Sequence, residues 1–181
     1  DDRGGGLVLL PGPYGTGATE QPASRTLAAR VRYDQGRVTL GGVLAARRYE
    51  GDAGDNTVIG PDAQFQIDDT WRVRGQWLRS QTSALPDAGG GLARGAAVGG
   101  QRRVVKLLRN ADFSESNLVI DDIDTGFRHD SGFVNQTGVR AISAYHNQGW
   151  GRLGPFNLFF LNLQVDRVTD RASGELVKEL I

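Results

Sequence analysis

Residues 56–82 read NTVIGPDAQFQIDDTWRVRGQWLRSQT and alternate apolar with polar side chains over most of their length. One series runs through Ile59, Phe65 and Ile67, and the positions between them carry Gly, Asp and Gln. A helix would mix both kinds of side chain on one stripe, whereas successive residues of a strand point to opposite faces. The stretch therefore predicts two strands, each with one apolar and one polar face.

The segment 68–70 fixes the register of this hairpin, because cross-strand partners must share a face. A three-residue loop at these positions satisfies both faces at once. It predicts the apolar pairs Ile67–Trp71, Phe65–Val73, Ala63–Gly75 and Pro61–Trp77, and the polar pairs Gln66–Arg72, Gln64–Arg74 and Asp62–Gln76.

The segment 27–44 alternates in the same way around a predicted four-residue loop at 34–37. That loop pairs Tyr33 with Val38, Val31 with Leu40 and Leu27 with Leu44, and places Arg32 opposite Thr39. Further strands are predicted at 99–109, 114–122, 136–146, 156–166 and 175–181.

The predicted connections alternate in length, as they do in an up-and-down transmembrane barrel. The short or moderate ones lie at 34–37, 68–70, 110–113 and 147–155, and the mostly longer ones at 50–55, 82–98, 123–135 and 167–174.

Composition excludes several classes of protein. Lys plus Arg and Asp plus Glu are equal at 21 each, so nucleic acid is not an expected partner. The absence of Cys removes disulfides and thiolate metal sites, and no apolar run approaches the ~18 residues of a membrane-spanning helix. Met is absent even at position 1, which predicts a processed chain or an internal segment.

Periodicity alone does not say whether the apolar face meets a protein core or lipid. Arginines on the polar face, Gly and Ala among the apolar residues, and alternating turn lengths favour lipid. We therefore predict lumen-facing polar residues and an interfacial set of aromatic residues at the short turns. The first set is Arg30, Arg32, Asp62, Gln64, Gln66, Arg72 and Arg74, and the second is Tyr33, Trp71 and Trp150.

Residues 123–141 read IDTGFRHDSGFVNQTGVRA. Together with the 56–82 hairpin, this segment resembles the C-terminal barrel of a bacterial outer-membrane family of unassigned function. Its members carry an N-terminal β-sandwich similar to family-nine carbohydrate-binding modules. The resemblance covers roughly residues 26–166 and implies no catalytic residues. It implies a segment or loop at 1–25, barrel strands at 26–181 without the sandwich, and further strands beyond the one that starts near Glu175.

His129, Asp130 and Ser131 stand side by side with Arg128, which invites a hydrolase interpretation. Neighbours in an extended chain point apart, whereas a catalytic triad converges in space. We therefore predict a polar surface loop here. His146, at the end of a predicted strand, has no evident partner.

Acidic and glycine-rich segments are the other candidates for chemistry. Asp121, Asp122, Asp124 and Asp130, or Asp52 and Asp55 with Asn56, offer oxygen ligands for calcium but lack the spacing of a calcium loop. GPYGTG at 12–17 and GGGLARG at 89–95 lack the Gly-Lys-Ser/Thr ending of a phosphate loop. We predict solvated acidic loops and flexible glycine loops, with no metal and no cofactor.

The sequence thus predicts an all-β, antiparallel up-and-down barrel, or part of one, in the outer membrane of a Gram-negative bacterium. The expected role is a porin-like pore, surface or transport component without catalysis. Its expected partners are outer-membrane lipid and a glycan or small solute, and its arginines either bind anionic solutes or pair with inward acids such as Asp62. The alternatives are a soluble β-sandwich or barrel that binds a carbohydrate or other small ligand and, third, a hydrolase that uses Ser131 or another loop serine. Strand number and oligomeric state stay open.

Overall fold

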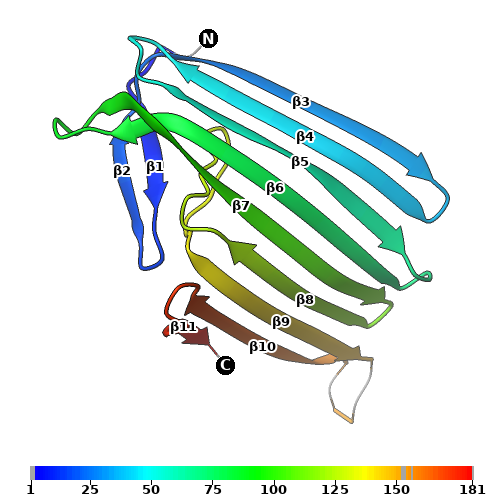
Figure 1. Ribbon diagram of the computed structural model, residues 1–181. Helices are drawn as coiled ribbons and strands as arrows, with labels where there is room; N and C mark the ends of the chain where they lie inside the picture. Colours follow the sequence, from blue (N-terminus) through cyan, green and yellow to red (C-terminus); the bar gives the residue numbers. More distant parts are fainter. Residues whose placement is uncertain (1–2, 152–153, 156, 181) are drawn as a thin grey trace.

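The chain folds into one large antiparallel sheet and one small hairpin sheet (Figure 1). The computed structural model describes residues 3–151, 154–155 and 157–180, none of which is helical. The nine strands of the large sheet pair strictly in sequence order, so the predicted all-β antiparallel meander is confirmed. The strands are β3 (Ser24–Gln35), β4 (Val38–Tyr49), β5 (Asp55–Gln66), β6 (Trp71–Pro86), β7 (Leu92–Ala111), β8 (Ser114–Ile123), β9 (Val139–Trp150), β10 (Phe159–Asp170) and β11 (Leu176–Leu180), and the small sheet holds β1 (Leu7–Pro11) and β2 (Thr16–Glu20).

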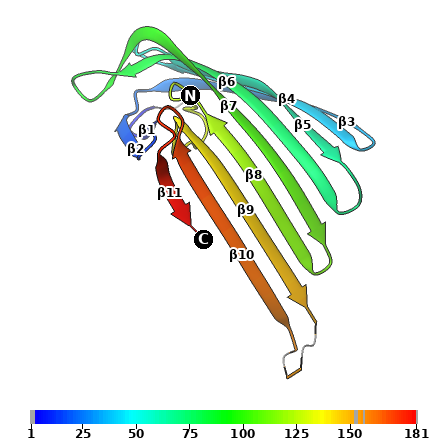
Figure 2. The same ribbon diagram turned by 60° about the horizontal axis from the view of Figure 1, so that its bottom comes forward.

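The large sheet is curved but not closed into a barrel. Strands β3 and β11 form its two edges, and each has one neighbour within the described part of the chain. The sheet curls so that the β1–β2 hairpin and the segment 124–138 lie on its concave side (Figures 1 and 2). We call this side the inner face and the convex side the outer face.

The predicted β5–β6 register is confirmed. Asp62 pairs with Gln76, Gln64 with Arg74 and Phe65 with Val73. The register is the same on both sides of Gly60 and Pro61, because Ile59 pairs with Arg79. In the turn, Asp68 Oδ1 accepts hydrogen bonds from the Thr70 and Trp71 backbone N–H groups, each at 2.8 Å. These bonds lower the pKa of the Asp68 carboxyl and hold the loop at the predicted length.

The predicted β3–β4 register is wrong by two residues. Tyr33 pairs with Leu40 and Gln35 with Val38, so the turn contains only Gly36 and Arg37. Gly36 has φ = 56°, a left-handed conformation that a tight two-residue hairpin uses and that glycine adopts without strain. A shift of two residues leaves every side chain on its predicted face.

The long loop predicted at 82–98 is also wrong. Strands β6 and β7 continue through it, with a bulge after Thr82, and meet in a tight loop at 87–91. Strand β9 begins three residues later than predicted, because Gln136 and Thr137 instead bond to the β1–β2 hairpin. Strand β10 also begins three residues later than predicted. Positions 156 and 181, where two predicted strands begin and end, lie outside the described residues.

The core lies on the inner face at the end of the sheet where the β1–β2 hairpin and the segment 124–138 cover it. We call this the loop end, and the end with the Gly36 and Asp68 turns the turn end. Phe127 and Val134, from the segment 124–138, pack on Val58, Leu78 and Ile123 of the sheet. A second cluster holds Val8, Tyr49, Ala53, Ala84 and Leu92.

Candidate functional site

The alternation of side chains gives the sheet two chemically different faces. Cross-strand partners lie on the same face of a sheet. The polar face of the β5–β6 hairpin therefore continues onto the neighbouring strands β4 and β7. Gly41 and Thr39 of β4 face Asp62 and Gln64, and Lys106 of β7 faces Arg74. Polar side chains from these four strands therefore gather on the inner face, and those of β5, β6 and β7 include charged ones.

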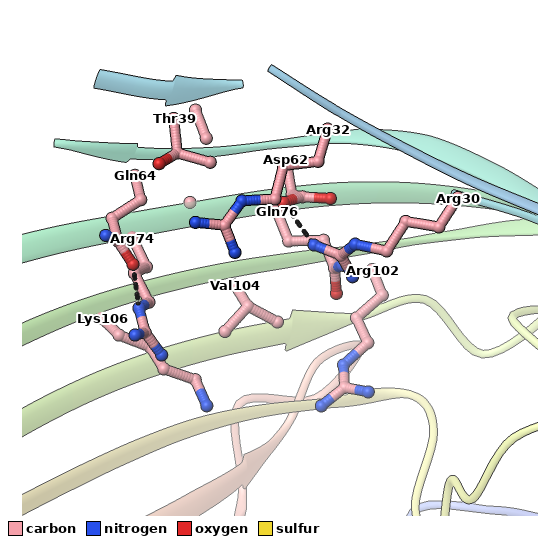
Figure 3. A pocket seen from close by; sticks show the side chains of 12 residues that line it. Arg30, Arg32, Thr39, Asp62, Gln64, Arg74, Gln76, Arg102, Val104 and Lys106 are labelled. Atoms are coloured by element: carbon pink, nitrogen blue, oxygen red, sulfur yellow. Dashed lines mark hydrogen bonds and ion pairs between the residues drawn. The ribbon is translucent and has the colours of Figure 1, made fainter. Parts of the chain in front are cut away.

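These side chains line an open groove of about 490 Å³ at the centre of the inner face (Figure 3). Five cationic side chains and one carboxylate border it. The cations are Arg30, Arg32, Arg74, Arg102 and Lys106; the acid is Asp62, and Thr39, Gln64 and Gln76 add neutral polar groups.

Three of the five cations have carboxylate partners. Arg30 donates to Asp62 at 2.9 Å and Arg32 to Asp34 at 2.7 Å. Arg102 donates to both oxygens of Asp121, the shorter distance being 2.6 Å. The Arg102–Asp121 pair neutralises the part of the groove nearest the loop end. The pairs of Arg30 and Arg32 neutralise its border at β3.

Arg74 and Lys106 differ from the other cations. They lie directly opposite each other on β6 and β7, and no carboxylate forms an ion pair with either within the described residues. Arg74 donates through Nε to the neutral Gln64 Oε1 at 2.7 Å, which leaves its terminal nitrogens directed at the groove (Figure 3). This part of the groove has a net positive charge.

All seven residues predicted to be lumen-facing lie on the inner face, and five of them line the groove. Gln66 and Arg72 lie nearer the turn end, where Arg72 Nε donates to Gln66 Oε1 at 2.7 Å. The prediction missed Arg102 and Lys106. Arg102 and Arg103 are adjacent in sequence, so one points to each face of the sheet. The alternation of polar and apolar residues that predicts the faces of the other strands is therefore interrupted here.

The outer face carries a continuous apolar band. Its members are exposed, from 38% for Val38 and Leu118 to 73% for Val31, although a soluble monomer exposes few large contiguous apolar patches. They belong to β3–β10: Leu27, Val31, Tyr33, Val38, Leu40, Ile59, Phe65, Trp77, Val105, Leu118, Ile120, Ile142, Leu161, Leu163 and Val165.

The three predicted interfacial aromatic residues all lie on the outer face at the turn end. Tyr33 and Trp150 are exposed, and Trp71 is half-buried beneath the Arg109 guanidinium, 5.9 Å from its ring. Trp150 also stacks beside Phe159, with ring centroids 5.5 Å apart. The structure thus brings the three to one border of the apolar band.

The loop end of the inner face is closed by a buried polar network. Arg128 and Asp130 form a two-pronged ion pair, and the Asp130 side chain is fully buried. Tyr49 Oη donates to Asp130 at 2.7 Å. Asn56 binds the same loop by donating to the Arg128 carbonyl and accepting from the Asp130 backbone N–H, each at 3.0 Å. The predicted polar surface loop is therefore wrong, because strand residues bury Arg128 and its neighbour Phe127.

The His-Asp-Ser sequence is not assembled into a triad. The Asp130 carboxylate is taken up by Arg128 and Tyr49, while Ser131 is exposed. Burial lowers the pKa of His129, which together with Asp130 lines a small cavity between the loop and β1. His146 lies within β9 and shares a 2.8 Å hydrogen bond with Ser116.

The acidic segments pair with arginines. Asp52 lies 2.8 Å from Arg94, and Asp122 accepts from Arg140 at 2.7 Å. Among the described residues, no three His, Cys, Asp or Glu side chains are grouped to hold a metal ion. Residues 12–15 and 89–91 of the two glycine-rich segments lie in hairpin turns, and the remaining residues 16–17 and 92–95 lie in strands β2 and β7.

The described residues contain no helix long and apolar enough to cross a membrane. No family model, no curated protein and no solved structure matches the chain.

Proposed function

We propose that this chain forms part of the wall of an outer-membrane β-barrel, with its outer face in lipid and its inner face toward water. The observation that carries the proposal is the exposed apolar band opposite a charged groove. On β4 the outer-face residues from Val38 to Ala46 are all apolar or glycine, over roughly 27 Å along the strand at ~3.4 Å per residue. A tilt of about 40° reduces this to about 21 Å, close to the ~25 Å apolar band of known barrels.

The aromatic residues at the turn end support the same orientation. Amphipathic rings are enriched where a membrane barrel meets the headgroup layer. A membrane also requires that the backbone groups of β3 and β11 be paired with further strands, because open edges are not stable in hydrocarbon.

The inner face favours a pore or transport component that prefers anions. Arg74 and Lys106 add positive charge that no carboxylate cancels, and charged side chains in a lumen set the preference for permeating ions. Neutral polar groups such as Gln76 also offer hydrogen bonds to a sugar or other small solute. No step of this function requires catalysis by the chain.

The orientation of the two faces can be tested with spin labels, because the chain has no native Cys. Leu163→Cys places a label on the outer face, and its neighbour Gln164→Cys places the same label on the inner face. In folded protein in bilayers, we expect the label at 163 to be relaxed by oxygen and the label at 164 by an aqueous nickel chelate. Equal access of the nickel chelate to both sites would contradict the proposal.

A gel comparison of boiled and unboiled protein gives a second check. A membrane barrel extracted in detergent migrates differently before and after boiling. Recovery of folded chain from buffer without detergent would instead support the soluble, small-ligand-binding alternative.

Ion preference is tested separately in planar bilayers under a salt gradient. We expect a reversal potential that indicates anion preference, and a shift toward cations for the double variant Arg74→Gln, Lys106→Gln. The matched control is Arg30→Gln, Asp62→Asn, which removes a neutral pair and leaves the net charge unchanged. An equal shift in both variants would show that Arg74 and Lys106 do not set the preference.

A further inference from the structure

Six exposed arginines border the apolar band at the loop end of the outer face. We call them the arginine belt. Each lies on a different strand and shares the face of its strand's apolar residues: Arg25 on β3, Arg48 on β4, Arg79 on β6, Arg103 on β7, Arg140 on β9 and Arg167 on β10.

The strand register places the belt along a diagonal across the sheet. Arg25 lies directly opposite Arg48, and Asp55 lies opposite Arg48 on its other side. Arg79 is level with Leu44 of β4, four residues nearer the turn end than Arg48. Arg103 and Arg140 lie on either side of Asp122, two strand spacings or about 10 Å apart, and Arg167 lies two residues from the cross-strand partner of Arg140.

Acidic residues offset only part of this charge. Asp122 is shared by Arg103 at 3.8 Å, Arg140 at 2.7 Å and Arg171 at 3.0 Å, so one carboxylate faces three guanidinium groups. Asp55 is the cross-strand partner of Arg48 and Glu179 that of Arg167, so three acids face the six arginines of the belt. Arg79 has only Ile59 and Gln101 as cross-strand partners. The belt keeps a net positive charge.

The opposite border of the band lacks such a belt. At the turn end, the outer face carries the aromatic residues Tyr33, Trp71 and Trp150, and Arg109 there lies over the Trp71 ring. One border of the same apolar surface is therefore cationic and the other aromatic. This asymmetry points to a partner that is anionic on one side of the band only.

We propose that the arginine belt binds phosphate groups of lipid headgroups in the leaflet at the loop end. Guanidinium groups bind phosphate oxygens through two parallel hydrogen bonds. The arginines of the belt lie at the border of the apolar band, which is the level of the lipid headgroups when the band lies in hydrocarbon. This inference rests on the proposed membrane location of the outer face.

The test uses the chain folded in phosphatidylcholine vesicles with a minor fraction of phosphatidic acid. The double variant Arg48→Gln, Arg79→Gln removes two belt cations that form no ion pair within the described residues. The matched control, Arg72→Gln, Arg109→Gln, removes the same charge at the turn end. Phosphatidic acid retained on the protein after detergent extraction is counted by native mass spectrometry.

We expect the wild-type chain and the turn-end control to retain phosphatidic acid in preference to phosphatidylcholine. An arginine near a charged lipid surface contributes about 1 kcal/mol, or about fivefold, so the belt variant should bind roughly 25-fold more weakly. Equal retention by the belt variant and the wild type, or no preference in the wild type, would overturn the proposal. Insertion into pure phosphatidylcholine is scored independently, so a failure of the membrane location itself is recognised by the absence of insertion.

Discussion

The two ends of the inner face carry similar polar side chains but differ in what covers them. At the centre and turn end, Arg30 and Arg74 border an open groove, and the Arg30 side chain is 57% exposed. At the loop end, Asn56 and Ser80 are almost completely buried, because the segment 124–138 lies on them. Alternation thus assigns residues to a face, whereas a separate segment decides whether that face is wet or dry.

The difference has an energetic consequence. An ion pair in contact with water contributes little, because solvent screens it and both long side chains lose freedom. A buried pair that loses one partner leaves a charge without solvent or counter-ion. Equivalent substitutions at the two ends should therefore have very different effects on stability.

Arg128→Leu should have the largest effect. The substitution removes the guanidinium that pairs with the buried Asp130 carboxylate and leaves the hydrogen bond from the Tyr49 hydroxyl. We expect a loss of about 3–5 kcal/mol in the free energy of unfolding, measured by urea unfolding in detergent.

Arg30→Leu is the matched control, since Arg30 also pairs with one aspartate but on the open groove. Its expected cost is below about 1 kcal/mol. Similar losses in the two variants would mean that the loop end is not drier than the groove.

Phe127→Ala should have the next largest effect. Phe127 is 1% exposed and fills the apolar cluster between the loop and the strands β5, β6 and β8. We expect a loss of about 3 kcal/mol, at the low end for this substitution, because the cluster is small and can partly collapse.

Phe133→Ala serves as the control within the same loop, because Phe133 is 77% exposed. It should leave the urea midpoint unchanged. A loss for Phe133→Ala as large as that for Phe127→Ala would show that the loop packs in another way.

Asn56→Ala should have a smaller effect. Its side chain binds both a carbonyl and an N–H group of the loop, and both would lose their partner at a buried site. We expect a cost of about 2 kcal/mol. Asn56→Asp keeps the oxygen that accepts from the Asp130 N–H group but replaces the NH₂ group that donates to the Arg128 carbonyl with a second acceptor. This variant should therefore also be less stable than the wild type.

Much of the fold is predictable from alternation. The β5–β6 register follows from the sequence because Asp68 has a turn-forming side chain and both faces agree on one loop length. The β3–β4 register was wrong because a slip of two residues preserves the faces, and the choice between loops depended on the conformation of Gly36. Alternation therefore fixes faces more firmly than it fixes partners.

The candidate site was predictable where polar residues alternate and not where the chain folds back. Arg30, Asp62 and Arg74 alternate with apolar residues and were predicted to share a face. The burial of Arg128 had no local signal, since its partners Asn56, Ser80 and Ala84 are more than 40 residues away in the chain. The arginine belt was missed because its six members lie on six different strands and are brought to one border of the sheet only by the register.

The smallest expected effect is a pH dependence of the covered end. Burial lowers the pKa of His129 in the folded chain below its ordinary value near 6.5, so the unfolded chain binds more protons as the pH falls. The free energy of unfolding should therefore decrease as the pH falls from 7.5 to 5.5. The Asp68 carboxyl does not contribute in this range, because its pKa is lowered from an already acidic value and it stays charged in both states. The chain has two histidines, so His129→Gln should reduce this decrease and His146→Gln should leave it in place. If His129→Gln retains the full decrease, the ring is not desolvated by the loop, and the contrast between a dry loop end and a wet groove is weaker than the geometry indicates.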